Sequence, residues 1–443
     1  MLIRDCYLSG WGRTSSVRGR AACPRSITEL EDLFSRDGNA PFLAYGGGRS
    51  YGDQALCTGG MAICTSQLTG TEDFDAEAGH VTVLGGTTLE QMIREFLPLG
   101  YLLPVSPGTS FATIGGAIAN DVHGKNHDGE GSFASCVEWL DLLTADNSIR
   151  RVSEQQGPDL YYATIGGGGL TGIILRARLR LRRVESNAVT VTETRIRNLD
   201  DFFAQLEAAR NRNHFTVGWI DAVSRGGSLG RGILEAADFS SVAVDTRPER
   251  ALRVPLDFPS LALNRWSVSA FNALYYRRVP TSGRTRALPI PKFLYPLDAI
   301  HDWNRIYGKR GFYQFQCAIP DADSFDAIKT LLEHISASGQ GSFLAVLKTL
   351  GEEGHGYLSF PRRGYTLALD FPRSPVSTDL LRTLERITLN YGGRIYLAKD
   401  AWLSADGFQR MYPRLEKMRD VLKKVDPDQR FDSDMARRLR LRG

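Results

Sequence analysis

The sequence lacks the marks of a disulfide framework, a zinc site and a membrane anchor. Its 6 cysteines are scattered over 443 residues and no two have CxxC spacing, which predicts neither a structural metal nor paired cysteines and suits a reducing compartment. Because no run of about 18 apolar residues is present, no membrane-spanning helix is expected. The first residues, MLIRDCYLSGWGRT, contain no apolar stretch typical of a secretory signal. These absences predict a cytoplasmic protein or one bound peripherally to a membrane.

A strong charge of one sign is also absent. The formal net charge is +4 and 23% of the residues are charged, so a nucleic-acid partner is not expected. The densest basic run, Arg437–Arg442, is interpreted as an exposed helix end rather than a binding patch. The composition is that of a soluble globular protein, and the length suits two or three domains.

Glycine is abundant, with 45 residues, and it forms three clusters in the first 175 positions. The first, Gly46–Gly48, follows the strand-like PFLAY, and its N–H groups can form a nest for a dinucleotide pyrophosphate; a plain turn is the alternative. The second, Gly115-Gly116, lies in a run of small residues that lets a helix approach a flat ligand or a sheet. The third, Gly166–Gly172, contains a GxGxxG spacing but precedes the strand-like IILRARLRL. Because a Rossmann loop opens a helix, that interpretation is rejected.

Hydrophobic periodicity predicts short strands among glycine-rich turns up to about residue 185, and a β/α region after it. Residues 255–297 show no clear period and are predicted to form a long loop or lid. Lys399 is expected to follow an apolar strand at 395–398. The other expected strands are 41–45, 80–84, 137–144, 149–152, 172–181, 312–319, 342–350 and 365–371, and the expected helices are 88–96, 200–210, 321–338, 378–389 and most of 405–441.

Motifs along nearly the whole chain resemble those of FAD proteins of the vanillyl-alcohol-oxidase family, and in particular its polyprenylphosphoryl-ribose oxidases. They include GWGRT at 10–14, GRSYGD at 48–53, PGTSFATIGGAIANDVHGKNH at 107–127, GGGGLTGII at 166–174, GGRIYLAKD at 392–400 and SDMARRL at 433–439. The resemblance implies an α+β fold with a two-part FAD-binding domain and a substrate domain that combines an antiparallel sheet with helices. The implied parts are an FAD-binding domain at 1–185, a substrate-binding domain at 186–393, and a segment at 394–443 that returns to the FAD-binding domain.

The same resemblance implies that FAD is bound without a covalent bond. Many relatives tether the flavin through a histidine at the position of Arg49, and bicovalent relatives also use a cysteine, which is missing from residues 107–126. The residues expected to contact FAD are Gly46, Gly47, Gly48, Arg49, Ser50, Tyr51, Pro107, Gly108, Thr109, Thr113, Gly115, Gly116, Ala119, Asn120, His123, Gly124, Asn126, Gly172, Ile173 and Lys399.

Four residues are expected to take part in catalysis, namely Lys399, Gln316, Lys348 and His123. A cation at Lys399 would stabilise the negative charge of reduced flavin or bind the substrate hydroxyl; an ordinary surface lysine is the alternative. His123 and His127 have the i, i+4 spacing of zinc ligands. No cysteine or carboxylate accompanies them as a partner, so no metal is expected, and a core histidine held by the backbone is the alternative for His123.

Side chains on neighbouring strands are expected to form a sugar pocket over the flavin. Gln314 and Gln316 alternate along one strand, and Ala368 and Asp370 along another, so each pair shares a face. Lys348 ends a third apolar strand. These five residues are the expected substrate-binding set, and a solvent-facing sheet is the alternative.

The resemblance implies hydride transfer from a sugar carbinol to the flavin, with the 2′-hydroxyl of a polyprenylphosphoryl-β-D-ribofuranose as the oxidised group. A separate short-chain NAD(P)H-dependent reductase would reduce the ketone to the arabinose epimer, and quinone or O2 would accept the electrons. Aromatic and arginine side chains in the expected lid suit peripheral contact with a membrane. Two alternatives stay open, an oxidase of a soluble alditol or aldonolactone and a flavin-binding module without activity. Retention of Lys399, Lys348 and both glutamines argues against the second.

Overall fold

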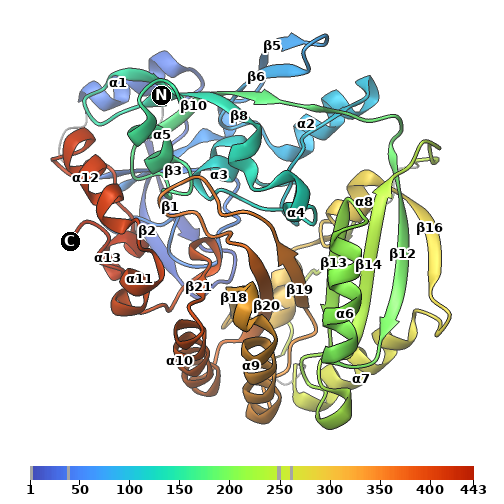
Figure 1. Cartoon of the computed structure of the whole chain (residues 1–443). Coiled ribbons are helices and arrows are strands. Elements are labelled where there is room, and N and C mark those ends of the chain that lie inside the picture. Colours follow the sequence, from blue (N-terminus) through green and yellow to red (C-terminus); the bar gives the residue numbers. More distant parts are fainter. Residues whose placement is uncertain (1–2, 37–39, 247–250, 260–262) are drawn as a thin grey trace.

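The computed structural model describes residues 3–36, 40–246, 251–259 and 263–443. Figure 1 shows the two ends of the chain, in blue and red, on one side of the molecule and the middle of the chain, in green to brown, on the other. The larger sheets have the strand orders β1-β2-β4-β3, β5-β6-β10-β8-β9 and β16-β12-β14-β13-β19-β20-β18-β21. This arrangement confirms the α+β class.

The first part of the chain forms two small sheets joined by glycine-rich turns. The four-stranded sheet consists of β1 (Ile3–Ser9), β2 (Ser16–Ala22), β3 (Phe42–Tyr45) and β4 (Met61–Cys64), with α1 (Ile27–Arg36) beside it. The five-stranded sheet consists of β5 (Thr71–Asp75), β6 (His80–Leu84), β8 (Val137–Leu143), β9 (Ile149–Val152) and β10 (Ile173–Arg180). In β10, Arg176 and Arg178 point outward and pair with Glu72 and with Asp73 and Glu138, while the residues between them are buried. The strand expected at 172–181 is therefore confirmed.

Two helices connect these sheets to the glycine clusters. Helix α2 (Leu89–Phe96) is capped by Thr88, whose hydroxyl accepts from the Gln91 N–H in a capping box, and it matches the helix expected at 88–96. Helix α3 (Ile114–Ala119) contains the second glycine cluster. A Cβ added at Gly115 would lie 3.1 Å from the carbonyl oxygen of Gly85, so the absence of a side chain lets α3 lie directly against the turn after β6.

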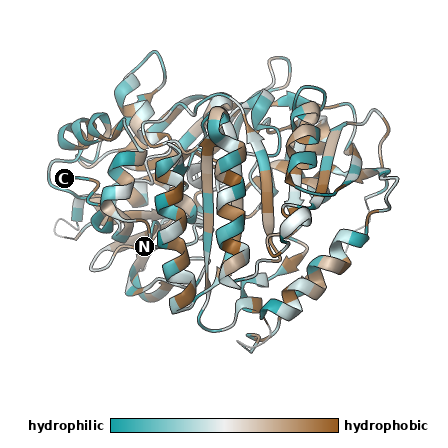
Figure 2. Ribbon diagram, turned by 60° about the horizontal axis from the view of Figure 1, so that its bottom comes forward, coloured by the Kyte–Doolittle hydropathy of each residue, from teal (hydrophilic) through white to brown (hydrophobic). Residues whose placement is uncertain are grey.

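The middle of the chain builds the eight-stranded sheet and the helices that cover one of its faces. Its strands are β12 (Ala188–Ile196), β13 (Phe215–Ile220), β14 (Gly232–Phe239), β16 (Arg284–Pro289), β18 (Phe312–Pro320), β19 (Ala345–Leu350), β20 (Gly364–Pro372) and β21 (Arg394–Ile395). Figure 2 shows the helices α6 (Leu199–Arg210), α9 (Ser324–Ser338) and α10 (Pro375–Asn390) in front of largely hydrophobic strands. The opposite face of β18, β19 and β20 is left to meet the glycine clusters.

The end of the chain packs against its beginning, so that residues far apart in sequence meet. Helices α11 (Ala405–Met411), α12 (Leu415–Val425) and α13 (Asp434–Arg438) lie beside the N-terminal strands in Figure 1. Arg438 in α13 makes ion pairs of 2.8 Å with both Asp53 and Asp400, and the Tyr51 N–H donates to the Ala398 carbonyl at 2.9 Å. The boundaries at 185/186 and 393/394 stay a prediction.

Two predictions of local structure were wrong. The described residues of 255–297 do not form a long loop; they include α7 (Arg265–Arg277), β16 and α8 (Ile290–Leu294), while 260–262 lie outside the described residues. Helix α7 escaped detection because large apolar side chains lie on its exposed face, which blurs the hydrophobic period. The strand expected at 395–398 ends at Ile395, and Lys399 closes a short 3-10 turn, Leu397–Lys399.

Candidate active site

A cleft of about 380 Å³ lies between the three glycine clusters and the uncovered face of the eight-stranded sheet. All of the residues expected to contact FAD line it except Gly124 and Asn126, and so do Gln314, Gln316, Lys348 and Ala368 of the expected sugar pocket. Gly124 and Asn126 lie behind the wall, where the Gly124 carbonyl accepts from Lys348 and the Asn126 amide donates to the Pro104 carbonyl at 2.8 Å. The structure thus brings together nearly every residue that the sequence singled out.

The first glycine cluster forms a part of the cleft floor that has no room for side chains. A Cβ at Gly46 would overlap the Thr113 hydroxyl, and one at Gly47 would overlap the Phe111 carbonyl oxygen. Gly48 has a φ of +63°, a conformation that L side chains rarely adopt. Bare backbone at this point fits the close approach of a flat dinucleotide. The buried Asn120 Oδ1, which has no hydrogen-bond partner among the described residues, adds an unused polar atom to the lining of the same cleft.

Lys399 contributes a cation to the cleft wall. Its Nζ lies 3.8 Å from the centroid of the Tyr51 ring. Burial lowers the pKa of Lys399 to about 8, with nearby Asp370 opposing this shift and Lys348 adding to it. The lysine is therefore near the midpoint of its titration in neutral to mildly alkaline solution.

Asp370 lies directly behind this wall and does not itself line the cleft, unlike the rest of the expected sugar pocket. Its carboxylate is fully buried and accepts from Gln314 Nε2 at 2.6 Å and from the Tyr307 hydroxyl at 3.2 Å. Burial raises its pKa to about 7, although Gln314, Lys399 and Tyr307 each lower it. A buried acid and a buried lysine with pKa values close to neutrality are typical of catalytic sites.

His123 is held as a neutral hydrogen-bond acceptor. Gln316 Nε2 lies 3.0 Å from His123 Nε2 and donates to it, and it also donates to Thr366 at 3.2 Å. Burial lowers the pKa of His123 far below its usual value, and the charges of Lys348, His127 and Lys399 lower it further. The proton therefore stays on Nδ1, a buried atom without a partner among the described residues. The alternative of a core histidine satisfied by the backbone is not supported.

Lys348 lines this side of the cleft, and His127 lies outside the lining, near Lys348. Lys348 Nζ donates to the Gly124 carbonyl at 3.0 Å, and its pKa is lowered to about 8 by burial and by Lys125. His127 Nδ1 accepts from the Gly351 N–H at 2.9 Å, and burial lowers its pKa to about 3. No group of three His, Cys, Asp or Glu side chains that could hold a metal ion is found in the described ranges.

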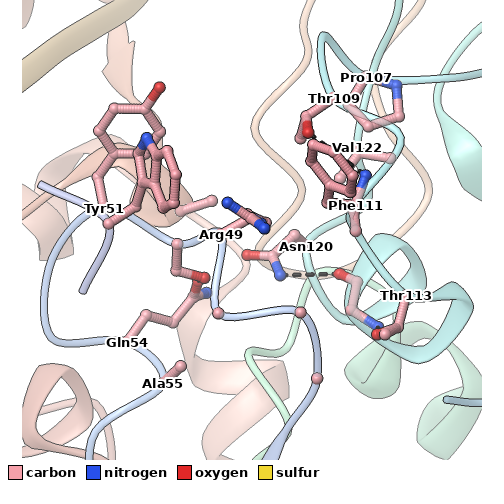
Figure 3. A pocket seen from close by; sticks show the side chains of 18 of the residues that line it. Arg49, Tyr51, Gln54, Ala55, Pro107, Thr109, Phe111, Thr113, Asn120 and Val122 are labelled. Atoms are coloured by element: carbon pink, nitrogen blue, oxygen red, sulfur yellow. Dashed lines mark hydrogen bonds between the residues drawn. The ribbon is translucent and has the colours of Figure 1, made fainter. Parts of the chain in front are cut away.

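Sequence reasoning did not assign a role to several residues that line the cleft. Trp11 and Phe111 lie on either side of the Arg49 guanidinium, whose carbon is 4.4 Å and 4.8 Å from the two ring centroids. Figure 3 shows Arg49 pointing into the cleft between Tyr51 and Phe111. The segment 297–303 forms the rim. The motifs GWGRT at 10–14 and PGTSFATIGGAIANDVHGKNH at 107–127, which contain Trp11 and Phe111, were the signals in the sequence for these two residues.

Comparison with known proteins identifies the cofactor and the family. Residues 20–153 match the family model described as FAD binding domain, and residues 366–439 match that of D-arabinono-1,4-lactone oxidase. Together with the fold and the cleft, these matches define an FAD-dependent oxidoreductase. Decaprenylphosphoryl-beta-D-ribose oxidase of Mycolicibacterium smegmatis is 35% identical over 98% of this chain and 97% of its own. The chain belongs to the decaprenylphosphoryl-β-D-ribose oxidase family.

Other relatives cover less of the chain. A protein encoded in the mprA 5′ region of Streptomyces coelicolor is 33% identical over 80% of this chain and 100% of its own. L-gulonolactone oxidase of Mus musculus is 28% identical over 42% of this chain and 43% of its own.

Proposed function

We propose that the protein oxidises the 2′-hydroxyl of a polyprenylphosphoryl-β-D-ribofuranose to a ketone. The observation that carries this proposal is the polar wall of the cleft, in which Lys399, Gln316 and Lys348 converge opposite the bare glycine floor. Bound FAD would supply the acceptor for the hydride that leaves the carbinol carbon. The similarity to a decaprenylphosphoryl-ribose oxidase over nearly the whole chain supports the choice of sugar.

Each side chain of the wall has a role in this reaction. The Lys399 ammonium donates to the sugar oxygen and stabilises the negative charge that develops there as the hydroxyl proton leaves to water. Asp370 raises the pKa of Lys399 and so helps to keep it charged. Because Gln316 uses its Nε2 on His123 and Thr366, its carbonyl oxygen is left to accept from a neighbouring sugar hydroxyl.

We propose that the implied domains bind the cofactor and the sugar separately. Residues 1–185 together with 394–443 hold FAD, and residues 186–393 hold the sugar. The proposal is supported by the hydrogen bond from Tyr51 to Ala398 and by the ion pairs of Arg438, which join the third segment to the first next to Lys399. FAD is expected to be bound without a covalent tether, since Arg49 cannot form a bond to the flavin.

The second candidate function is oxidation of a soluble aldonolactone or alditol. It is favoured by the match of residues 366–439 to the D-arabinono-1,4-lactone oxidase model, because this range includes Ala368, Asp370 and Lys399. Anaerobic mixing of the holoenzyme with farnesylphosphoryl-β-D-ribofuranose, xylitol or L-gulono-1,4-lactone separates the two functions. We expect the phosphorylated riboside to bleach the flavin. Bleaching by the lactone or xylitol alone would replace the first function with the second.

The ketone product requires a partner that consumes it, and we propose a short-chain NAD(P)H-dependent reductase. In a coupled assay with such a reductase, the riboside should be converted to its arabinose epimer with consumption of NAD(P)H. Accumulation of the ketone in the presence of an active reductase would argue against the pairing. The reduced flavin would pass its electrons to a quinone or to O2, which can be compared as acceptors in the same assay.

We also propose that α7 contacts a membrane surface. None of the described helices is long and apolar enough to cross a bilayer. On α7, Trp266 and Leu274 are 80% and 75% exposed, Phe271 is exposed beside them, and Arg265 and Arg277 flank this group. The helix contains no acidic residue. Apolar side chains framed by arginines suit an interface that contains anionic lipid, where a polyprenyl substrate would be found.

A further inference from the structure

Arg49 is a partly buried cation without an anion. Among the described residues no carboxylate forms an ion pair with it, it makes no hydrogen bond, and its Nε is a buried atom without a partner. The guanidinium is held between the Trp11 and Phe111 rings. Stacking fixes the plane of the guanidinium but satisfies none of its N–H donors. A planar fork of five donors, fixed in position and left unused inside a cleft, is suited to a phosphate group.

The carboxylates that face Arg49 are already engaged by other groups. Asp298 accepts from the Thr109 hydroxyl at 2.8 Å and from the Ser110 N–H at 2.7 Å. Asp302 accepts from Arg253 at 2.8 Å. Both raise the pKa of Arg49, whereas burial, the largest influence, lowers it. The site therefore keeps a full positive charge without an internal salt bridge that a ligand would have to break.

The surroundings of Arg49 distinguish between two sources of phosphate, a phosphodiester with an alkyl chain and the pyrophosphate of a dinucleotide. The rim residues beside Arg49 include the apolar side chains of Leu297, Ile300 and Trp303. Strand β17 (Ile300–His301) pairs with β15 (Leu252–Arg253), and Leu252 is 68% exposed on the outer side of this rim. An anion at Arg49 thus lies next to a path of apolar side chains that leads out of the cleft. A phosphodiester with an alkyl chain fits this combination, whereas a dinucleotide pyrophosphate fits the side-chain-free floor at Gly46–Gly48.

We propose that Arg49 binds the phosphate of an alkyl-phosphate substrate and directs its alkyl chain over the rim formed by 297–303 and β15. The inference rests on the proposed function and names the group by which that substrate is recognised. It makes Arg49 a specificity-determining residue that separates phosphorylated sugars from free sugars and lactones.

The test measures binding to the holoenzyme rather than turnover. Titration with farnesyl phosphate and with farnesol is followed by the change in flavin absorbance, and FAD affinity is measured separately by fluorescence. In Arg49→Gln we expect the affinity of the holoenzyme for farnesyl phosphate to fall about ten- to a hundredfold, the loss of one charge-assisted contact, with farnesol binding unchanged. Arg49→Lys should be intermediate, because an ammonium keeps the charge but not the fork. Arg18→Gln, which removes an exposed arginine of β2 outside the cleft, is the matched control.

Three results would overturn the inference. The first is a parent enzyme that binds farnesyl phosphate no more tightly than farnesol. The second is an Arg49→Gln variant that has a lowered FAD affinity and whose remaining holoenzyme binds farnesyl phosphate normally, which would assign Arg49 to the cofactor's pyrophosphate. The third applies if Arg49→Gln does not fold: unchanged farnesyl phosphate affinity in Arg49→Lys would then argue against a phosphate contact at Arg49. Failure of farnesylphosphoryl ribose to bleach the flavin, with tight and Arg49-dependent farnesyl phosphate binding, would refute the proposed oxidation but not this phosphate site.

Discussion

Replacement of Lys399 by methionine tests the centre of the proposed mechanism. The change removes the ammonium group and keeps a side chain of similar length against the Tyr51 ring, which lies 3.8 Å from Nζ. The glycine-lined floor is untouched, so cofactor content should be unchanged. The expected loss is in the step in which the sugar oxygen gains negative charge.

The size of the loss follows from the burial of the site. Removing one preorganised electrostatic donor typically costs about two to three orders of magnitude in rate, roughly 3–4 kcal/mol. The pKa values of about 8 for Lys399 and about 7 for Asp370 place the active protonation state between them. The parent rate should fall above pH 8, as Lys399 loses its proton, and below pH 7, as Asp370 gains one. In Lys399→Met the alkaline fall should disappear.

Anaerobic stopped-flow reduction of the flavin by farnesylphosphoryl ribose at pH 7.5 measures this step apart from reoxidation. Lys417→Met is the control, because Lys417 also lies over a tyrosine ring, that of Tyr357, but is exposed on α12 and outside the cleft. If Lys399→Met reduces its flavin within threefold of the parent rate, or keeps the alkaline fall, the assignment of Lys399 to the reacting oxygen is wrong.

Four further predictions concern the cofactor, the buried acid and α7. Gly48→Val should give insoluble or FAD-free protein, because the position has a φ of +63° and a Cβ would overlap the Tyr45 hydroxyl. Full FAD occupancy in this variant would show that the loop is only a turn. Acid precipitation of the parent protein should release all of its flavin into the supernatant. Asp370→Asn should raise the Tm relative to the parent, and by more at pH 8 than at pH 5: the folded-state pKa of about 7 lies above the unfolded value, so the parent loses stability as pH rises from about 4 to 7. An equal difference at both pH values would contradict this. Trp266→Ser combined with Leu274→Ser should weaken flotation with anionic liposomes while leaving flavin content unchanged, and equal flotation would exclude α7 as the contact.

Local patterns in the sequence were sufficient for much of the framework. The strand expected at 172–181 is β10, and the helix expected at 88–96 is α2. The strand after Gly166–Gly172 was enough to reject a Rossmann loop. These features depend on neighbours within one or two turns of the chain, so their physical cause is visible in a short window of sequence.

The site itself was decided by tertiary structure. Nothing near Asp370 in the sequence indicates that Gln314 and Tyr307 donate to its carboxylate, or that burial raises its pKa to about 7. The Trp11–Arg49–Phe111 stack likewise joins three separate segments. The sequence by itself determined part of the strands, the glycine clusters and the residue types available for chemistry. Only the packing of distant segments decided which charges are buried together, because desolvation and pairing depend on distance in space and not on separation along the chain.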